Sequence, residues 1–189
     1  LSSGEHIVII VNAPSDVSSK NSIDLNSIPE NFTIFYGGGI GNDRGTDTIC
    51  KAVKTLPDVQ LVIMGPCSED YGDYLKNICQ NAPNIELHLK WALHEEIIQR
   101  ATAADMLFAF YDPDIPNNKY ASPNKLFEAM MCNKPILVND NTSMAEIVRE
   151  EKCGLIVPYG DVNATKCAVL TLKNDPALCK HLGENGRKA

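Results

Sequence analysis

Short, strongly apolar runs alternate with longer amphipathic runs from residue 32 onward. The apolar runs are 32–36, 60–64, 85–89, 106–111, 135–139 and 154–158. The runs between and after them predict helices at 45–56, 69–81, 94–103, from 123, near 143–151 and near 161–173. Strands that are apolar at nearly every position are buried on both faces, as in a parallel sheet covered by helices. The pattern therefore predicts a doubly wound α/β fold: a six-stranded, Rossmann-like parallel sheet with helices on both faces.

The first 31 residues have a different character. The run HIVIIVN (6–12) predicts one strand, and residues 13–31 are polar and rich in turn formers, which is typical of a linker or a long loop. The chain also starts with Leu rather than Met. We therefore expect a fragment in which residues 1–31 are an entry strand and linker and residues 32–189 form one domain.

Composition narrows the possible ligands. The net charge of −7 provides no broad cationic field for nucleic acid or for an acidic membrane surface, so an anionic ligand needs a small local site. Seven dispersed cysteines without a CxxC pair predict free thiols in a reducing compartment. No run approaches the roughly 20 apolar residues that a membrane span needs, and no signal peptide begins the chain. We expect a cytoplasmic protein.

Ligands of open parallel sheets bind at the carboxyl ends of the strands, so the segments that follow strands carry the candidate chemistry. The first is YGGGIGNDRG (36–45), whose glycines allow a ligand to approach the backbone closely. Because Asn42 follows Gly37 and Gly39 where GxGxxG needs glycine, and no Walker motif exists in the chain, neither familiar nucleotide loop is present. Arg44 stands at the start of the next helix, and a plain glycine turn with a solvated arginine is the alternative.

The next two segments are less specific. In MGPCSEDYG (64–72), Gly65 and Pro66 end a strand and Ser68 can cap the following helix. In KWALHEE (90–96), we favour Trp91 as a packing residue over a base-stacking one. His94 is interpreted as a residue at the start of a helix and not as a catalytic group.

The fourth segment, YASPNKLFEAMMCNKPI, combines a strong helix start with a single acid. Ser122 is a good N-cap and Pro123 a good first helical residue, and the free N–H groups of such a start attract phosphate. Glu128 follows Lys125 by three residues and Asn124 by four, so the three share one face.

Apolar residues flank Glu128 on both sides. A buried carboxylate without partners costs several kcal/mol, whereas one that binds ligand hydroxyls does not. The alternative is a surface Lys125–Glu128 ion pair, worth about 0–1 kcal/mol. We favour a Glu128 that faces a ligand.

The segment SPNKLFEAMMCNKPILVND resembles the signature segment of retaining glycosyltransferase family 4, also called glycosyl transferases group 1, which has the two-domain GT-B fold. Other stretches follow in the order of that family: FYGGGIGNDRGTDTICKAV, LVIMGPCSEDYGDYLKNI, NIELHLKWALHEEIIQRATAADMLFAFY and the carboxyl-terminal stretch from EIVREEKCGLIVPYG onward. The resemblance covers residues 32–189. It implies half of a GT-B enzyme, the half that binds the nucleotide sugar, while the acceptor-binding half would precede it.

The resemblance also implies roles for individual residues. Glu128 matches the glutamate that holds the ribose hydroxyls, and the amides of Asn124 and Lys125 match those that meet the diphosphate. Arg44 stands where the family usually has a lysine that contacts the phosphates. The full set expected at the donor is Gly38, Gly39, Gly65, Ala92, His94, Tyr120, Ser122, Asn124, Lys125 and Glu128, with Ala92 and His94 bordering the base.

Two positions depart from the family pattern. The first of two glutamates spaced eight residues apart is Tyr120 here, and the arginine of the glycine loop corresponds to Gly39. Lys125 or Lys119 is a candidate replacement for the missing phosphate cation. We interpret both changes as a changed donor or geometry rather than a dead enzyme.

The implied reaction is transfer of a hexosyl group from a nucleotide diphosphate sugar, with retained configuration, to a saccharide or lipid-linked acceptor, as in polysaccharide biosynthesis. Arg44, Lys125 and the helix start at Ser122 would stabilise the leaving diphosphate. No cofactor and no metal are implied, nucleic acid is not a partner, and the full-length enzyme associating peripherally with the inner face of the membrane is an alternative localisation. The fragment alone is expected to be inactive. Two other functions stay open: a nucleotide-sugar-binding module without transfer, and a GT-B-type sugar-nucleotide epimerase.

Overall fold

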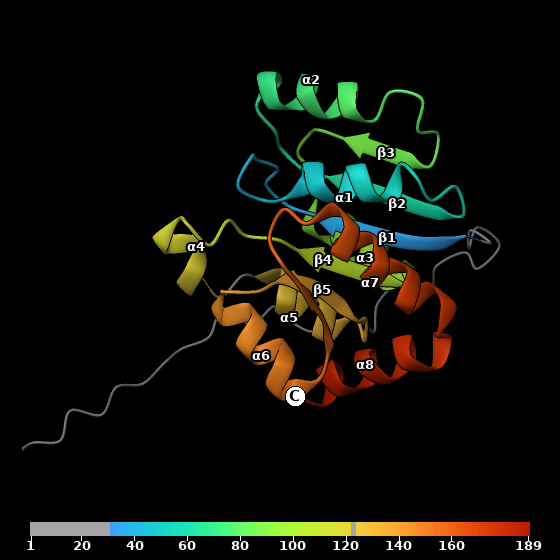
Figure 1. Ribbon diagram of the computed structural model, residues 1–189, viewed down its shortest axis with the longest axis vertical. Coiled ribbons are helices and arrows are strands. Elements are labelled where there is room, and N and C mark those ends of the chain that lie inside the picture. Colours follow the sequence, from blue (N-terminus) through green and yellow to red (C-terminus); the bar gives the residue numbers. More distant parts are fainter. Residues whose placement is uncertain (1–30, 122–123) are drawn as a thin grey trace, which may run out of the picture.

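The computed structural model describes residues 31–121 and 124–189 (Figure 1). Its sheet has six strands in the order β3-β2-β1-β4-β5-β6, and all neighbouring pairs are parallel. The strands are β1 (Phe32–Gly37), β2 (Val59–Met64), β3 (Ile85–His88), β4 (Met106–Ala109), β5 (Ile136–Asn139) and β6 (Gly154–Val157). The predicted fold class is confirmed. The predicted strand 6–12, nearly all of the linker, and the helix start at Ser122 and Pro123 lie outside the described residues.

Eight helices occur in the described residues: α1 (Thr46–Val53), α2 (Glu69–Ile78), α3 (His94–Ala103), α4 (Pro116–Tyr120), α5 (Asn124–Met131), α6 (Ser143–Glu151), α7 (Val162–Asn174) and α8 (Pro176–Lys188). The hydrophobic pattern does not predict α4, which is polar and five residues long, or α8, which contains two glycines. A Cβ at Gly183 would collide with the backbone carbonyl of Asn133, so this glycine allows α8 to lie against the end of α5. Asp175 starts α8 by accepting a hydrogen bond from the N–H of Leu178 at 2.9 Å.

The helices cover both faces of the sheet because successive strand residues point to opposite sides. Ile34 and Tyr36 of β1 lie in the core formed with α1, α2 and α7. Phe35, between them, lies in the core formed with α3, α5 and α6. Helix α8 packs against α5 and α7 and also contributes Leu182 to the first core. This two-faced burial explains the near-continuous apolar strands.

All six strands run in the same direction, so the loops that follow them gather at one edge of the sheet. Helix α4 marks this edge at the left of Figure 1. The loop after β1 runs beside the loop after β2: Gly38 N–H donates to Met64 O at 2.8 Å, and Ile40 N–H donates to Pro66 O at 2.9 Å. The glycine turn is therefore fixed to its neighbour by backbone hydrogen bonds.

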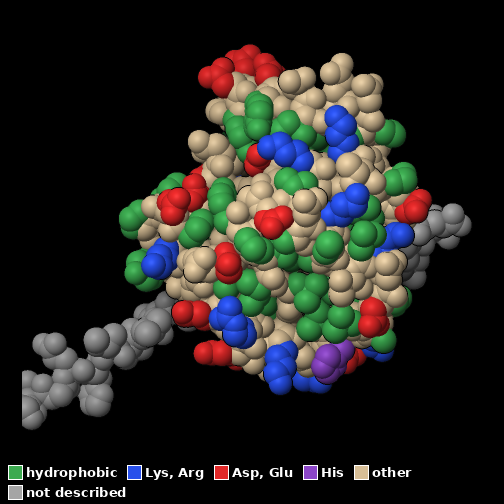
Figure 2. Space-filling model, in the orientation of Figure 1, with side chains coloured by type: hydrophobic (Ala, Val, Ile, Leu, Met, Phe, Trp, Pro, Cys, Tyr) green, Lys and Arg blue, Asp and Glu red, His purple; other side chains and the backbone are tan. Residues whose placement is uncertain are grey.

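Figure 2 shows the face that carries α1 and α7, where acidic and basic side chains are interspersed and no broad basic area is present. No helix in the described part of the chain has the length and apolar character to cross a membrane. The described cysteines are all free; Cys50, Cys132 and Cys153 are buried and Cys167 is exposed.

Candidate functional site at the carboxyl edge of the sheet

Two glycines bring three chain segments into contact at the end of β1 and β2. Gly38 has φ +142° and Gly65 has φ +149°, a region that favours glycine. A Cβ at Gly65 would overlap the backbone carbonyl of Gly38, and a Cβ at Gly38 would overlap the ammonium group of Lys125. The predicted residues Gly38, Gly65 and Lys125 are thus brought together. Gly39 differs, because a Cβ there would meet open space.

Tyr36 closes this turn from below. Its hydroxyl donates a hydrogen bond to the carbonyl of Gly39 at 2.6 Å, and its ring lies 4.9 Å from the Nζ of Lys125. Burial raises the pKa of Tyr36, so the phenol stays protonated and can donate at any physiological pH. The contact between a cation and an aromatic ring helps to hold Lys125 over the glycine turn.

Arg44 is held by a second group of side chains. Its Nη1 donates to Asn118 Oδ1 at 2.8 Å and lies 3.4 Å from Asp43 Oδ2. The guanidinium carbon lies 4.1 Å from the centre of the Tyr111 ring. Asn118 completes the group by donating from Nδ2 to Asp43 Oδ2 at 3.0 Å.

Glu128 and Lys125 lie on α5 beside the turn, and both are largely closed to solvent. Glu128 is 9% exposed. Burial raises its pKa, while the neighbouring Lys125 and His94 oppose that rise. Burial lowers the pKa of Lys125, the charge of Glu128 opposes this, and the charge of Arg44 adds to it. The surface ion pair considered as the alternative is not formed, because no Lys125–Glu128 salt bridge occurs within the described residues and both groups are desolvated.

A cleft of about 400 Å³ lies beside Arg44, and neither Lys125 nor Glu128 lines it. It lies between the loop after β1 and the loop after β2, and it is lined by Gly39, Ile40, Gly41, Asp43, Arg44, Pro66, Cys67 and Ser68. Ser68 stands at the N-cap of α2 as predicted, but its side chain makes no capping hydrogen bond. The cleft thus combines backbone of a glycine loop, one arginine and an open helix start, groups that suit an anion. The carboxylate of Asp43 lies among them, and Glu69 and Asp70 follow in the first turn of α2.

The outer rim is formed by the loop after β3 and by α4. Ala92 packs against the core below, and His94 is the exposed first residue of α3. Trp91 is 86% exposed, so the interpretation of Trp91 as a packing residue is wrong; Ala92, its small neighbour, takes the inward position instead. Tyr120 is 72% exposed.

The other predicted residues are placed less tightly. Asn124, the first residue of α5, is exposed. The Lys119 ammonium lies 5.7 Å from the Tyr120 ring, whereas the Lys125 ammonium lies at Gly38 in the glycine turn. Of the two candidate replacement cations, Lys125 is therefore the one at the turn.

Sequence reasoning missed Tyr36, Asp43, Tyr111 and Asn118. Tyr36 and Tyr111 end apolar strand runs and read as core residues. Asn118 stands among polar residues that are exposed, and only its burial at 3% distinguishes it. A sequence signal existed only for Asp43, which directly precedes Arg44 in the glycine loop.

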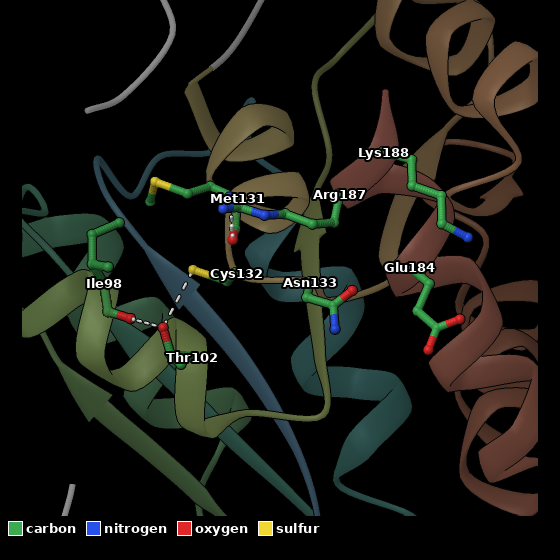
Figure 3. Close-up of a pocket in the computed structure, with 8 residues that line it drawn as sticks. All are labelled: Ile98, Thr102, Met131, Cys132, Asn133, Glu184, Arg187 and Lys188. Atoms are coloured by element: carbon green, nitrogen blue, oxygen red, sulfur yellow. Dashed lines mark hydrogen bonds between the residues drawn. The ribbon is translucent and has the colours of Figure 1, made fainter. Parts of the chain in front are cut away.

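A second cavity, of about 450 Å³, lies away from this edge between α3, α5 and α8 (Figure 3). Thr102 and Cys132 point toward one another there, with the Thr102 hydroxyl 3.4 Å from the Cys132 sulfur. Arg187 reaches from α8 to the carbonyl of Met131 at 3.1 Å. None of the predicted site residues lines this cavity. Among residues 31–121 and 124–189, no cluster of three or more His, Cys, Asp or Glu side chains could hold a metal ion.

Comparison with curated proteins gives relatives of one kind. The capsular polysaccharide biosynthesis glycosyltransferase CapM of Staphylococcus aureus is 27% identical over 167 residues, which are 84% of this chain and 41% of CapM. An uncharacterized glycosyltransferase of Methanocaldococcus jannaschii is 25% identical over 159 residues, which are 84% of this chain and 42% of that protein. The chain spans about two fifths of the length of these curated relatives.

Solved structures share the fold. The carboxyl-terminal domain of LpcC, a group 1 glycosyl transferase from Francisella tularensis, matches with a TM-score of 0.70 at 19% identity over 86% of each chain. Anabaena HepE in complex with UDP-glucose matches with a TM-score of 0.73 at 16% identity, over 86% of this chain and 44% of HepE. Residues 18–189 match the family model described as glycosyl transferases group 1. The chain therefore belongs to the glycosyl transferases group 1 family, and its fold is that of the carboxyl-terminal half of a GT-B glycosyltransferase.

Proposed function

We propose that residues 32–189 bind a nucleotide diphosphate sugar at the carboxyl edge of the sheet, as the donor domain of a hexosyltransferase that retains anomeric configuration. The observation that carries the proposal is Glu128: an acid that is 9% exposed and makes no salt bridge in the described chain, three residues after the lysine of α5 that reaches the glycine turn. A desolvated carboxylate in this position suits the two adjacent hydroxyls of a ribose, because they can replace the water that it has lost.

The remaining roles follow from position. Arg44 and Lys125 place two cations beside the glycine loop, where they would stabilise the charge that develops on the leaving diphosphate. The backbone of Gly38 and Gly39 would allow the phosphates close approach, with the amide of Asn124 adding a donor. Gly65, Tyr120 and Ser122 complete the proposed donor set, and Ala92 and His94 would border the base.

Relatives suggest the donor and the pathway class. HepE is described in complex with UDP-glucose, and CapM with capsular polysaccharide biosynthesis. We take a uridine diphosphate sugar as the first donor to test, and a saccharide or lipid-linked saccharide as the acceptor. The acceptor would bind to a preceding domain, of which residues 1–31 would be the last strand and the linker. Such an enzyme would work in the cytoplasm or at the inner face of the membrane.

A binding module without transfer is the second candidate. Tyr120 replaces the first glutamate of the family pattern and Gly39 replaces a cation. Loss of both groups would weaken contacts to the transferred sugar and to the phosphates while Glu128 still bound the ribose. Assay of the full-length protein with each donor and a saccharide acceptor distinguishes a transferase from a module.

The donor site is tested by calorimetric titration of the 189-residue chain with UDP, UDP-glucose, GDP and ADP. For Glu128→Gln we expect a loss of UDP affinity of about ten- to hundredfold, since hydrogen bonds to a charged group contribute about 1.5–3 kcal/mol. Glu150→Gln, on the exposed side of α6, is the matched control and should bind like the wild type. A folded Glu128→Gln variant with unchanged affinity for every nucleotide would contradict the proposed site.

A further inference from the structure

Asn118 is a buried polar residue on an exposed helix. It is 3% exposed, whereas its neighbours on α4, Pro116, Asn117, Lys119 and Tyr120, are all exposed. A buried amide is costly unless both of its ends are hydrogen-bonded. Here the oxygen accepts from Arg44 at 2.8 Å and the nitrogen donates to Asp43 at 3.0 Å. Both hydrogen bonds of the Asn118 side chain are thus made to residues of the glycine loop.

These contacts fix the guanidinium of Arg44 in a particular way. Both polar contacts, to Asn118 and to Asp43, are made by the single nitrogen Nη1, while the guanidinium carbon lies over the Tyr111 ring, 4.1 Å from its centre. Nε and Nη2 make no hydrogen bond with the described residues. The side chain retains 26% exposure. Arg44 is therefore held by Nη1 and by the Tyr111 ring, and Nε and Nη2 are left to bind an anion.

A lysine at position 44 would not be held in this way. An ammonium group is a compact point charge without a planar face, so it cannot stack on Tyr111, donate to Asn118 and offer further fixed donors at once. The arginine and its three neighbours form a matched set. A second tie strengthens it: Asp112 N–H donates to Asp43 O at 3.0 Å, which links the loop after β1 to the chain after β4.

We propose that Asn118 is the positioning residue that orients Arg44 toward the diphosphate of the donor. This inference rests on the proposed function. Asn118 would not touch the nucleotide; it would act through Arg44. Tyr111 would act in the same way, because the guanidinium carbon lies over its ring. The link from α4 to the glycine loop then makes phosphate binding depend on a helix that lies directly before α5.

The test compares UDP with uridine, which has the same base and ribose but no phosphates. Affinities of the 189-residue chain are measured for the wild type, Asn118→Ala, Arg44→Ala, the double variant and Arg44→Lys, with Asn117→Ala as the exposed neighbour control. Asn118→Ala should weaken UDP binding about tenfold and leave uridine binding unchanged, because the loss concerns a group on the phosphates. In the Arg44→Ala background the same change should have no further effect on UDP.

Asn118 is buried, so Asn118→Ala could disturb folding. The Arg44 side chain is partly exposed, and Arg44→Lys therefore provides a second variant that tests the proposal without that risk. It keeps the charge but loses the orientation, so UDP binding should weaken while uridine binding does not. Equal losses for UDP and uridine in Asn118→Ala, additive effects in the double variant, or wild-type UDP affinity in Arg44→Lys would each overturn the positioning role. A wild-type chain that binds none of UDP, GDP and ADP would contradict the proposed function itself. A wild-type chain that binds UDP through Glu128 while the Asn118 and Arg44→Lys variants behave normally would contradict only this inference.

Discussion

At the scale of single residues, Glu128 combines a charge with a nearly closed position on α5. The ionisable groups that interact with it are Lys125 on its own helix, Cys132 just after that helix, His94 at the start of α3 and Tyr111 just after β4. Lys125 and His94 favour the ionised acid, yet burial outweighs them and raises the pKa of Glu128. The folded chain therefore binds a proton at Glu128 more tightly than the unfolded chain does. An acid kept at a cost in stability is typical of a residue retained for binding.

The pH dependence of stability tests this directly. Because the pKa of Glu128 is raised on folding, its contribution is favourable below the unfolded pKa and is lost as the pH rises through the folded pKa. Glu128→Gln removes the ionisation, so at pH 7 the variant should melt at a higher temperature than the wild type, and the difference should vanish as the pH falls below the unfolded pKa of 4.5. For a domain of this size each kcal/mol corresponds to about 2–4 °C.

Scanning calorimetry across this pH range measures the difference, with exposed Glu150→Gln as the control that should follow the wild type. The same Glu128→Gln variant should have lost nucleotide affinity. A gain in stability at every pH, or no gain at pH 7, would show that burial does not destabilise the ionised form of Glu128.

At the scale of elements, the sequence predicted the sheet because buried parallel strands carry their own signature. Runs such as 60–64 and 135–139 are apolar on both faces. For runs this short, a buried parallel strand is the structure that the pattern indicates. The sequence also predicted that several of the candidate residues would lie together, because strand ends in a parallel sheet share one edge; binding of a ligand there stays a prediction. It did not predict α4, whose polar residues carry no helical periodicity.

What the sequence could not supply is the pairing of elements distant in the chain. Asn118 meets Arg44 only because the chain after β4 returns beside the loop after β1, and nothing local to either residue indicates this. Trp91 is an opposite case, since a large aromatic residue next to a strand end usually packs inward. Here the alternation of the loop places Ala92 inward and leaves Trp91 exposed.

The contact between the loop after β1 and the loop after β2 leads to a prediction about stability. Gly65→Ala should destabilise the domain by about 1–3 kcal/mol, because the new Cβ would meet the Gly38 carbonyl and the backbone at φ +149° is unfavourable for alanine. Gly39 directly follows Gly38 in the loop after β1 and has open space for a Cβ. Gly39→Ala should therefore change stability by less than about 0.5 kcal/mol. Urea denaturation of both variants compares the midpoints. Equal effects would mean that the contact between the two loops does not fix the turn.

At the scale of the whole molecule, the donor site and the reaction have different requirements. The described residues proposed to contact the donor come from one edge of one sheet. We therefore expect a chain that spans about two fifths of its curated relatives to hold the donor site. Transfer also needs an acceptor hydroxyl held beside the anomeric carbon of the sugar and exclusion of water from the reacting groups, and a single sheet edge provides neither. We therefore expect the 189-residue chain to bind UDP but to leave UDP-glucose intact.

A coupled assay measures the rate of UDP release from UDP-glucose by the 189-residue chain and by the full-length protein under the same conditions. The chain should release no more UDP than buffer does, whether or not a saccharide is present, and the full-length protein should release UDP only with its acceptor. Glu128→Gln in the full-length protein should reduce that rate through weaker donor binding, so the loss should appear mainly in KM. Acceptor-dependent UDP release by the 189-residue chain alone would mean that this one domain carries the acceptor site as well, because a saccharide can accelerate the reaction only where it binds beside the donor.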